Sequence, residues 1–224
     1  MAAIALSAAA ALSSWSRGAL ITLSVTALVL LWHSKRKHLT IPLLVVGTAL
    51  ALVSLPEAWF DRMYTIASYE AEGSAQSRLH VWHVGIQHAL TFPVTGVGFD
   101  GWHYAVVTLD WHNSYVEMMA EHGFIAFGIW CVLLFGTIIS LFRLSRTAAR
   151  SPQLAWVRNY SQMLGASLVA YAAGSLFLGL SYWDIPYHLI VIAVLLTERA
   201  RKAESHPVTD RPGGAFQAVR QCSG

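Results

Sequence analysis

Residues 18–33 read GALITLSVTALVLLWH, an apolar run without an acidic residue, lysine or arginine. The run stops just before Lys35, Arg36 and Lys37, and a second apolar run follows at 39–55. Further apolar runs lie at about 115–142, 160–180 and 184–197. Several of these runs approach the roughly 20 residues with which an α-helix crosses a bilayer. The pattern predicts an all-α, polytopic integral membrane protein with about five membrane-associated helices.

The composition favours the same class of protein. Hydrophobic residues make up 55% and charged residues 12% of the chain, whereas an average soluble domain has roughly 25% charged residues. The basic residues cluster beside apolar runs and form no stripe interleaved with aromatics, so the net charge of +3 does not indicate nucleic-acid binding. Cys131 lies in an apolar run and Cys222 near the C-terminus, which indicates neither a disulfide framework nor a thiolate metal site.

The N-terminal sequence MAAIALSAAAALSSW has no positively charged segment before its apolar part. A secretory signal begins with such a segment. We therefore interpret this stretch as the end of a membrane helix.

A mixed polar stretch, Pro56 to Asn113, separates the second apolar run from the third. Its charges, glycines and prolines exclude it from lipid and predict an extramembrane loop. Inside the loop, residues 74–90 have apolar residues at helical spacing, namely Leu79, Trp82, Ile86 and Leu90. These predict a short helix that Pro93 ends soon after, with a stripe suited to a membrane surface or to a lid. The Gly96-Val97-Gly98 sequence that follows predicts a tight bend.

Charge predicts the orientation of the chain. Alternation of the spans places most basic residues on one side: Lys35, Arg36, Lys37, Arg143, Arg146, Arg150, Arg158, Arg199, Arg201 and Lys202. Such residues mark the cytoplasmic side, so the loop at 56–113 is expected in the periplasm. The loop and its flank are acidic instead: Glu57, Asp61, Glu70, Glu72, Asp100, Asp110, Glu117 and Glu121. We expect a membrane domain at 1–200 and a flexible cytoplasmic tail at 201–224.

Three features of the outer side are candidates for function. Arg17 lies between two apolar stretches, where a charge suggests either a functional partner or a side chain that reaches the interface or an acidic residue. Ser114-x-x-Glu117 matches a capping box and would place His112 and Asn113 just before a membrane helix. Glu117 and Glu121 share one helical face, as a catalytic pair would, or Glu117 caps the helix and Glu121 pairs with an arginine.

A cluster of histidines raises the question of a metal site. The cluster consists of His80, His83, His88, His103 and His112. The chain has no HExxH pattern and no cysteine near these residues, so we predict that no metal is bound.

Five fragments occur in an order that resembles the O-antigen ligase and polymerase superfamily over about residues 12–200. They are Ser16-Arg17-Gly18, Arg78-Leu-His-Val-Trp82, Pro93-Val-Thr-Gly96-Val-Gly98-Phe99, His112-Asn-Ser-Tyr-Val-Glu117 and Glu121-His-Gly-Phe124. Arg62-Met-Tyr-Thr-Ile66 and Phe177-Leu-Gly-Leu-Ser-Tyr-Trp-Asp184 are more similar to the O-glycosylation ligases of exosortase A systems, although that branch usually has His-Ser where this chain has His112-Asn113. Family members are about twice as long, so the chain resembles their C-terminal half.

The resemblance implies transfer of a glycan from undecaprenyl diphosphate to an acceptor hydroxyl, on a glycan or a protein, at the outer face of a bacterial inner membrane. Attack inverts the anomeric carbon, and no cofactor is implied. Arg17 and Arg78 would bind the diphosphate in a bidentate way, and His112 would be the base. The residues expected to bind substrate are Arg62, Trp82, Asn113, Glu117, Glu121 and Asp184. A structural ion pair is an equal alternative for Asp184.

Two other functions stay open at this point. A polymerase of the same superfamily differs from a ligase only in its acceptor, so the sequence does not separate them. A transporter subunit would also have polytopic helices and a lone arginine. The ionisable residues concentrate in the loop and its flanks, however, which favours chemistry at an interface.

Overall fold

The computed structural model describes residues 2–34, 36–64, 73–101 and 110–205, without the side chains of 2–5, 62, 63 and 73–75. Every regular element in these ranges is helical, so the all-α prediction is confirmed for them. The elements are α1 (Ala2–Ser13), α2 (Arg17–His33), α3 (Lys37–Ser54), α4 (Glu57–Tyr64), α5 (Gly73–Thr91), α6 (Ser114–Ala148), the 3-10 turn η3 (Pro152–Leu154), α7 (Ala155–Gly174) and α8 (Asp184–Ser205).

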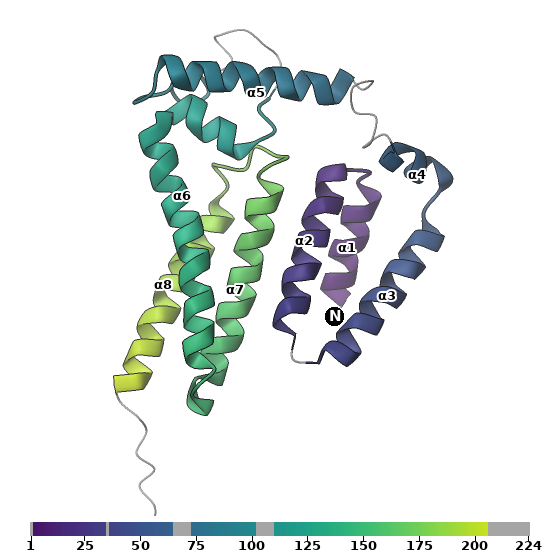
Figure 1. Cartoon of the computed structure of the whole chain (residues 1–224), viewed down its shortest axis with the longest axis vertical. Coiled ribbons are helices and arrows are strands. Elements are labelled where there is room, and N and C mark those ends of the chain that lie inside the picture. The colour runs from purple at the N-terminus through teal and green to yellow at the C-terminus, as the bar shows by residue number, and fades with distance from the viewer. Residues whose placement is uncertain (1, 35, 65–72, 102–109, 206–224) are drawn as a thin grey trace, which may run out of the picture.

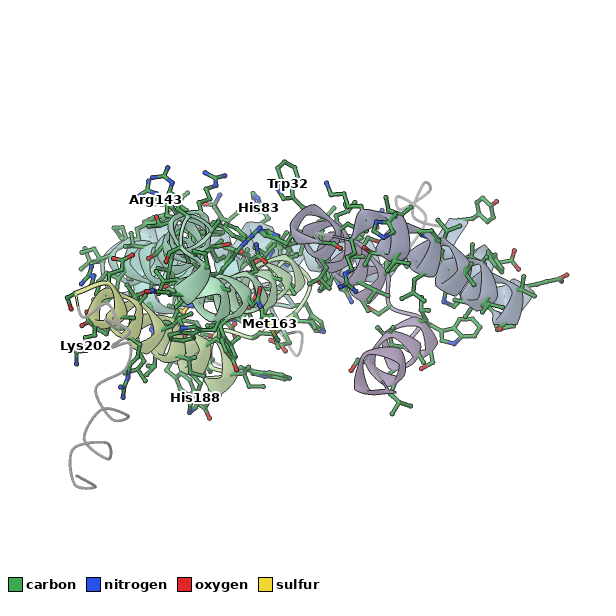
Figure 2. All side chains as sticks on the ribbon, turned by 90° about the horizontal axis from the view of Figure 1, so that it is seen from below. Trp32, His83, Arg143, Met163, His188 and Lys202 are labelled. Atoms are coloured by element: carbon green, nitrogen blue, oxygen red, sulfur yellow. The ribbon has the colours of Figure 1, made fainter. Side chains whose placement is uncertain are left out.

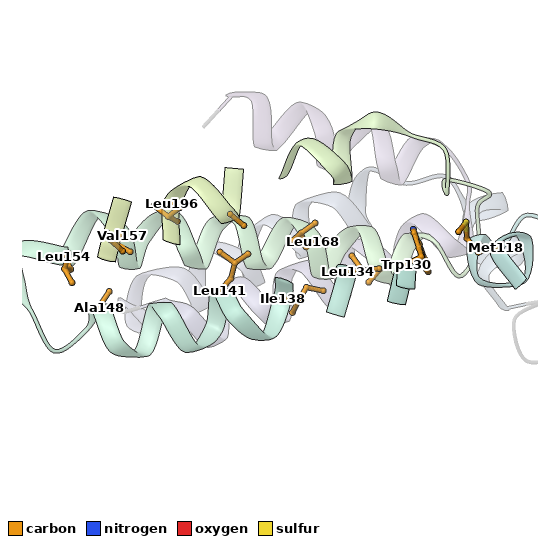
Figure 3. Close-up of a cluster of buried hydrophobic side chains, with 13 residues drawn as sticks. Met118, Trp130, Leu134, Ile138, Leu141, Ala148, Leu154, Val157, Leu168 and Leu196 are labelled. Carbon is orange, nitrogen blue, oxygen red and sulfur yellow. The ribbon is translucent and has the colours of Figure 1, made fainter. Parts of the chain in front are cut away.

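The main apolar core lies between α6, α7 and α8, which run along one another (Figure 1). Large residues such as Trp130, Leu134, Leu141, Leu168 and Leu196 meet there (Figure 3). On its other side α7 packs against α2, and α1 packs against α2. The three core helices and α2 thus form a bundle with two distinct ends.

The two ends of this bundle differ in what covers them. Helix α5 lies across one end, which we call the α5 end (Figure 1). The α2–α3 connection and the C-terminal ends of α6 and α8 lie at the other end (Figure 1), which we call the basic end. Figure 2 views the molecule from the basic end, where Arg143 and Lys202 project outward.

Helix α6 changes direction at Gly123, whose φ of 75° and ψ of 177° are not helical. The chain before this kink docks by its backbone on the turn at 93–98. Phe124 N donates to Pro93 O at 2.8 Å, and Val97 N donates to Ala120 O at 2.9 Å. A Cβ atom on Gly123 would lie 2.6 Å from the Val94 carbonyl carbon, and one on Gly96 would lie 2.3 Å from that of Glu121. The bend predicted at Gly96 is confirmed, and its purpose is this close approach.

Within the described ranges, two helices are long and apolar enough to cross a membrane, α3 with a mean hydropathy of 1.6 and α6 with 2.4. Helix α2 is apolar as well but has 17 residues. Helix α3 has no buried residue. Helices occur at all five predicted apolar runs, whereas the number of membrane spans and the side on which the loop lies stay predictions.

Several predicted boundaries need correction. Helix α7 ends at Gly174 and not near 180, because the loop after it binds the start of α6. Helix α8 continues to Ser205, so 201–205 are helical and not a flexible tail. Its extension carries an ion pair between Arg201 and Glu198 at 3.2 Å. The remaining tail lies outside the described residues.

The loop helix predicted at 74–90 is confirmed as α5, which spans Gly73–Thr91. Of the predicted stripe, Leu79, Ile86 and Leu90 are exposed, whereas Trp82 is partly buried and packs against the cluster of Val81 and Trp111. The packed face holds Val81, Gly85 and Ala89 instead. Gly85 lets this face approach α6 closely, because a Cβ atom there would lie 2.4 Å from the Trp111 ring.

Candidate functional site: a pocket of carboxylates beside His112

Helix α6 begins at Ser114, as predicted, but the capping box is wrong. The N-cap is Asn113, whose side-chain oxygen accepts from Tyr115 N at 2.9 Å and from Val116 N at 3.2 Å. The Ser114 hydroxyl is occupied by the α7–α8 loop: it donates to Leu178 O at 2.9 Å and accepts from Leu180 N at 2.7 Å. Asn113 is buried, so its predicted contact with substrate has no support in its position.

Glu117 does not cap the helix either, because the α7–α8 loop binds its carboxylate. The Ser181 hydroxyl donates to Glu117 Oε2 at 2.5 Å, and Ser181 N donates to the same oxygen at 3.3 Å. Both residues are buried. Gly179 passes close by, since a Cβ atom there would lie 3.2 Å from Glu117 Oε1. The loop therefore fixes this carboxylate from one side.

Glu121 lies one turn further on the same face and is also buried. Trp111 Nε1 donates to Glu121 Oε1 at 2.8 Å, and the Tyr182 hydroxyl donates to Oε2. Asp100 N donates to Oε2 at 3.3 Å. No arginine pairs with Glu121 among the described contacts, so the expected ion pair is replaced by neutral donors.

The two glutamates face a cavity of about 140 Å³ that we call the acidic pocket. Its walls are Phe99, Asp100, Asp110, Trp111, Glu117, Glu121 and Tyr182. Phe99 and Tyr182 meet edge to face with ring centroids 4.8 Å apart. Four carboxyl groups and three aromatic rings line the cavity, and no lysine or arginine among the described residues does so.

His112 stands directly after two wall residues and has a left-handed backbone, with φ of 49°. Its Nδ1 lies 2.8 Å from the carbonyl oxygen of Asp110. A carbonyl only accepts, so we assign the proton of the neutral ring to Nδ1, which leaves the lone pair of Nε2 available as a base. The Asp110 carboxylate accepts from Trp111 N at 2.7 Å and helps to hold this turn.

Tyr182 couples the α7–α8 loop to the pocket. Burial and then the hydrogen bond to Glu121 raise the pKa of its phenol well above the ordinary value of 10.0. The same hydroxyl lies 2.9 Å from His122 Nε2. The phenol therefore stays protonated and keeps donating to Glu121 at every physiological pH.

The other predicted site residues do not belong to the walls of this pocket. Arg17 begins α2, and the next residue, Gly18, abuts Phe177 so closely that a Cβ atom would lie 2.7 Å from the Phe177 Cβ. This contact brings the start of α2 to the α7–α8 loop. Arg78 lies on α5 and its side chain is exposed. It precedes Val81 by one turn, and Val81 packs against α6.

Trp82, Asp184 and Arg62 differ in how they relate to the pocket. Trp82 supports its wall, because Trp82 Nε1 donates to Trp111 O at 2.9 Å. Asp184 starts α8 with an exposed side chain and is absent from the pocket walls. Arg62 belongs to α4, but its side chain lies outside the described residues.

The family model described as O-Antigen ligase matches residues 2–131, more than half of the chain. The chain belongs to the O-antigen ligase family. No curated protein matches it. The particular similarity to ligases of exosortase A systems stays an expectation.

The family match includes Arg17, Arg78, His112 and both glutamates, but it ends before the loop that completes the pocket. Sequence reasoning missed Asp100, Asp110 and Trp111 as wall residues, and Ser181 and Tyr182 as partners of the glutamates. Residues 177–184 stood out in the sequence only because they resemble a family motif. No rule of residue spacing predicts that they contact α6. In the described ranges, no group of three histidine, cysteine or acidic side chains is arranged to hold a metal ion.

Proposed function

We propose that this O-antigen ligase family member transfers a glycan from undecaprenyl diphosphate to an acceptor hydroxyl at the periplasmic face of the inner membrane. The observation that carries the proposal is the position of His112. Its ring is oriented through Nδ1 by the Asp110 carbonyl, and the residue directly follows Trp111, which belongs to the wall of the acidic pocket. A base at this place removes the proton of the acceptor hydroxyl as its oxygen attacks the anomeric carbon.

The acidic pocket suits a sugar and not a phosphate. Carboxylates accept hydrogen bonds from hydroxyl groups, and aromatic rings such as Trp111 and Tyr182 offer apolar faces beside them. Four carboxyl groups would repel a diphosphate. We therefore assign the hydroxyl groups of the transferred sugar or of the acceptor to this pocket, and the diphosphate to a place outside it.

Arg17 and Arg78 are the proposed partners of the diphosphate. When the bond between the anomeric carbon and the phosphate oxygen breaks, negative charge grows on the leaving group, and a guanidinium fork matches two phosphate oxygens. Arg17 begins a helix, whose N-terminus also favours an anion. The new glycosidic bond forms at the opposite face of the carbon, and the acceptor proton ends on His112.

Membrane placement is part of the proposal, and two observations support it. Helix α3 exposes apolar side chains along its whole length, including Leu43, Val45, Leu50 and Val53, which favours contact with lipid. Most lysine and arginine residues belong to segments at the basic end, whereas the segments that line the acidic pocket meet at the α5 end (Figure 1). By the positive-inside rule the α5 end faces the periplasm.

The test is glycan transfer from undecaprenyl-diphosphate-linked donor in membranes with matched protein levels, for the wild type, His112→Ala and His188→Ala. His188 is the matched control, because its Nδ1 also lies 2.8 Å from a backbone carbonyl, that of Asp184, but it lies on α8 and does not line the pocket. We expect His112→Ala to lose roughly 10²- to 10⁴-fold in turnover and His188→Ala to stay near wild type.

Near-normal turnover of His112→Ala would remove His112 as the base. Supplying either lipid-linked repeat units or a completed lipid or protein acceptor in the same assay separates a polymerase from a ligase. If the wild type transfers to neither acceptor while the donor is intact, glycan transfer by this chain is refuted.

A further inference from the structure

A second and larger cavity lies at the basic end, between α2, α6 and α7, with a volume of about 550 Å³. Its lining includes Arg146, Arg158, His33, Gln162, Leu28 and Trp32, and we call it the basic pocket. Pockets that bind small molecules have volumes of roughly 300 to 1,000 Å³. It shares no residue with the acidic pocket.

The polar wall of the basic pocket is cationic and incompletely satisfied. Arg158 comes from α7 and Arg146 from the last turns of α6, and no acidic residue among the described ones lines the cavity. The Nε atom of Arg158 is buried and has no hydrogen-bond partner within the described structure. Arg146 and Arg158 therefore bring positive charge to the cavity wall, and no carboxylate among its described lining residues neutralises that charge.

The opposite wall is apolar and opens to the outside of the bundle. Leu28 is 66% exposed and Trp32 is 81% exposed. Figure 2 shows Trp32 projecting from α2 at the edge of the molecule. His33 stacks on Phe142 with ring centroids 5.2 Å apart, which joins α2 to α6 at the floor of the cavity. A ligand here meets cations at one side and hydrocarbon at the other.

We propose that the basic pocket binds an anionic phospholipid, with its phosphate on Arg146 and Arg158 and its acyl chains along the Leu28 and Trp32 face of α2. Basic pockets between membrane helices on the cytoplasmic side bind acidic headgroups, and arginine matches a phosphate with its planar fork. The inference rests on the proposed membrane placement but not on glycan transfer. It assigns to the protein a lipid site at the membrane face opposite the proposed chemistry.

The test compares binding of phosphatidylglycerol and phosphatidylcholine to the purified full chain, by native mass spectrometry and by the shift in thermal unfolding temperature. The test variant is Arg146→Gln with Arg158→Gln. The control is Arg143→Gln with Arg150→Gln, which removes two charges from exposed residues at the same end that do not line the pocket. We expect at least about 10-fold weaker phosphatidylglycerol binding in the test variant, a factor that corresponds to about 1.4 kcal/mol, and little change in the control.

Equal losses in both double variants would mean that surface charge alone attracts the lipid, and would overturn the proposal. Equal binding of phosphatidylcholine would overturn it too, because the arginines would then select nothing. Inorganic phosphate is added as a third ligand, and if it stabilises the wild type as strongly as the lipid does, the site binds a free anion instead.

A wild-type measurement keeps the proposal testable if the double variant does not fold. A phosphatidylglycerol carrying a photoreactive group on its acyl chain should label α2 around Leu28 and Trp32. Labelling restricted to α3 and α8, with none on α2, would contradict the proposed position of the chains. Activity of the enzyme does not enter either readout, so failure here leaves the proposed transfer function untouched.

Discussion

The acidic pocket and the basic pocket differ in whether their buried polar groups have hydrogen-bond partners within the protein. In the acidic pocket each glutamate already has partners from the protein: Ser181 donates to Glu117, and Trp111 and Tyr182 donate to Glu121. In the basic pocket the buried Nε of Arg158 has no partner in the described structure. The first arrangement is preorganised, and the second is open to a ligand that brings its own charge.

The difference suggests that the charged groups of the two pockets have different roles. Fixed carboxylates in a cavity of about 140 Å³ keep their positions when a substrate arrives, which is what a reaction centre requires. Arginines in a cavity of about 550 Å³ with an exposed apolar wall accommodate a flexible molecule. We therefore expect substitutions at the α5 end to change turnover and those at the basic end to change lipid binding.

The largest difference between the two ends is expected when an arginine is changed to lysine at each of them and glycan transfer is measured. Arg17→Lys and Arg78→Lys keep the charge but remove the bidentate fork, so we expect each to lower glycan transfer by roughly 10²-fold. Arg143→Lys at the basic end should leave transfer unchanged, since Arg143 is exposed and lines neither pocket. Transfer rates in membranes at matched protein levels measure this. Normal rates in both α5-end variants would favour a transporter or scaffold role.

A smaller but still clear effect is expected in the kink of α6. Gly123 has a backbone conformation that is essentially restricted to glycine, and an added Cβ would meet the Val94 backbone. We expect Gly123→Ala to lower the free energy of unfolding by about 2 kcal/mol or more. Gly128→Ala, five residues on in the same helix, meets nothing within 4 Å and should cost no stability. Thermal unfolding of both variants measures this, and equal stability would contradict the close backbone approach at Gly123.

The smallest effect is a dependence on alkaline pH. The pKa of Tyr182 is raised in the folded protein, so its stabilising contribution is complete below the ordinary value of 10.0 and declines as pH rises through the higher folded value. The difference in unfolding temperature between wild type and Tyr182→Phe should therefore be constant from pH 7 to about 9.5 and shrink above about pH 10. Tyr160→Phe, on an exposed residue of α7, is the control. A difference that already shrinks near pH 8 would exclude the phenol–carboxylate bond.

Most of the helices could be predicted from the sequence, because apolar runs and flanking basic clusters report local periodicity. The details of the pocket could not. Ser114-x-x-Glu117 matched a capping box, yet the neighbouring Asn113 caps the helix because the α7–α8 loop occupies the Ser114 hydroxyl, through Leu178, 64 residues away. The packed face of α5 was missed for a similar reason, since the small size of Gly85 matters only beside Trp111.

The candidate site was predictable in its components but not in its assembly. His112, Glu117 and Glu121 are close in sequence and stand out as ionisable groups at the start of an apolar helix. Ser181 and Tyr182 reach them from a distant loop. A hydrogen bond between a hydroxyl and a carboxylate that are far apart in the chain produces no repeating pattern in the sequence. Arg17 was found by its place between two apolar stretches and Arg78 through the family resemblance, and their contacts with substrate remain predictions.

The hydrogen bond between Tyr182 and Glu121 spans 61 residues of chain, which has a consequence for synthesis. A ribosome adds roughly 5 to 20 residues per second, so Glu121 is made about 3 to 12 s before its phenol donor exists. During that interval the only donors to this carboxylate that already exist among its described partners are Trp111 Nε1 and Asp100 N, which precede it in the chain. The acidic pocket is therefore complete only once the α7–α8 loop has been made, long after both of its glutamates.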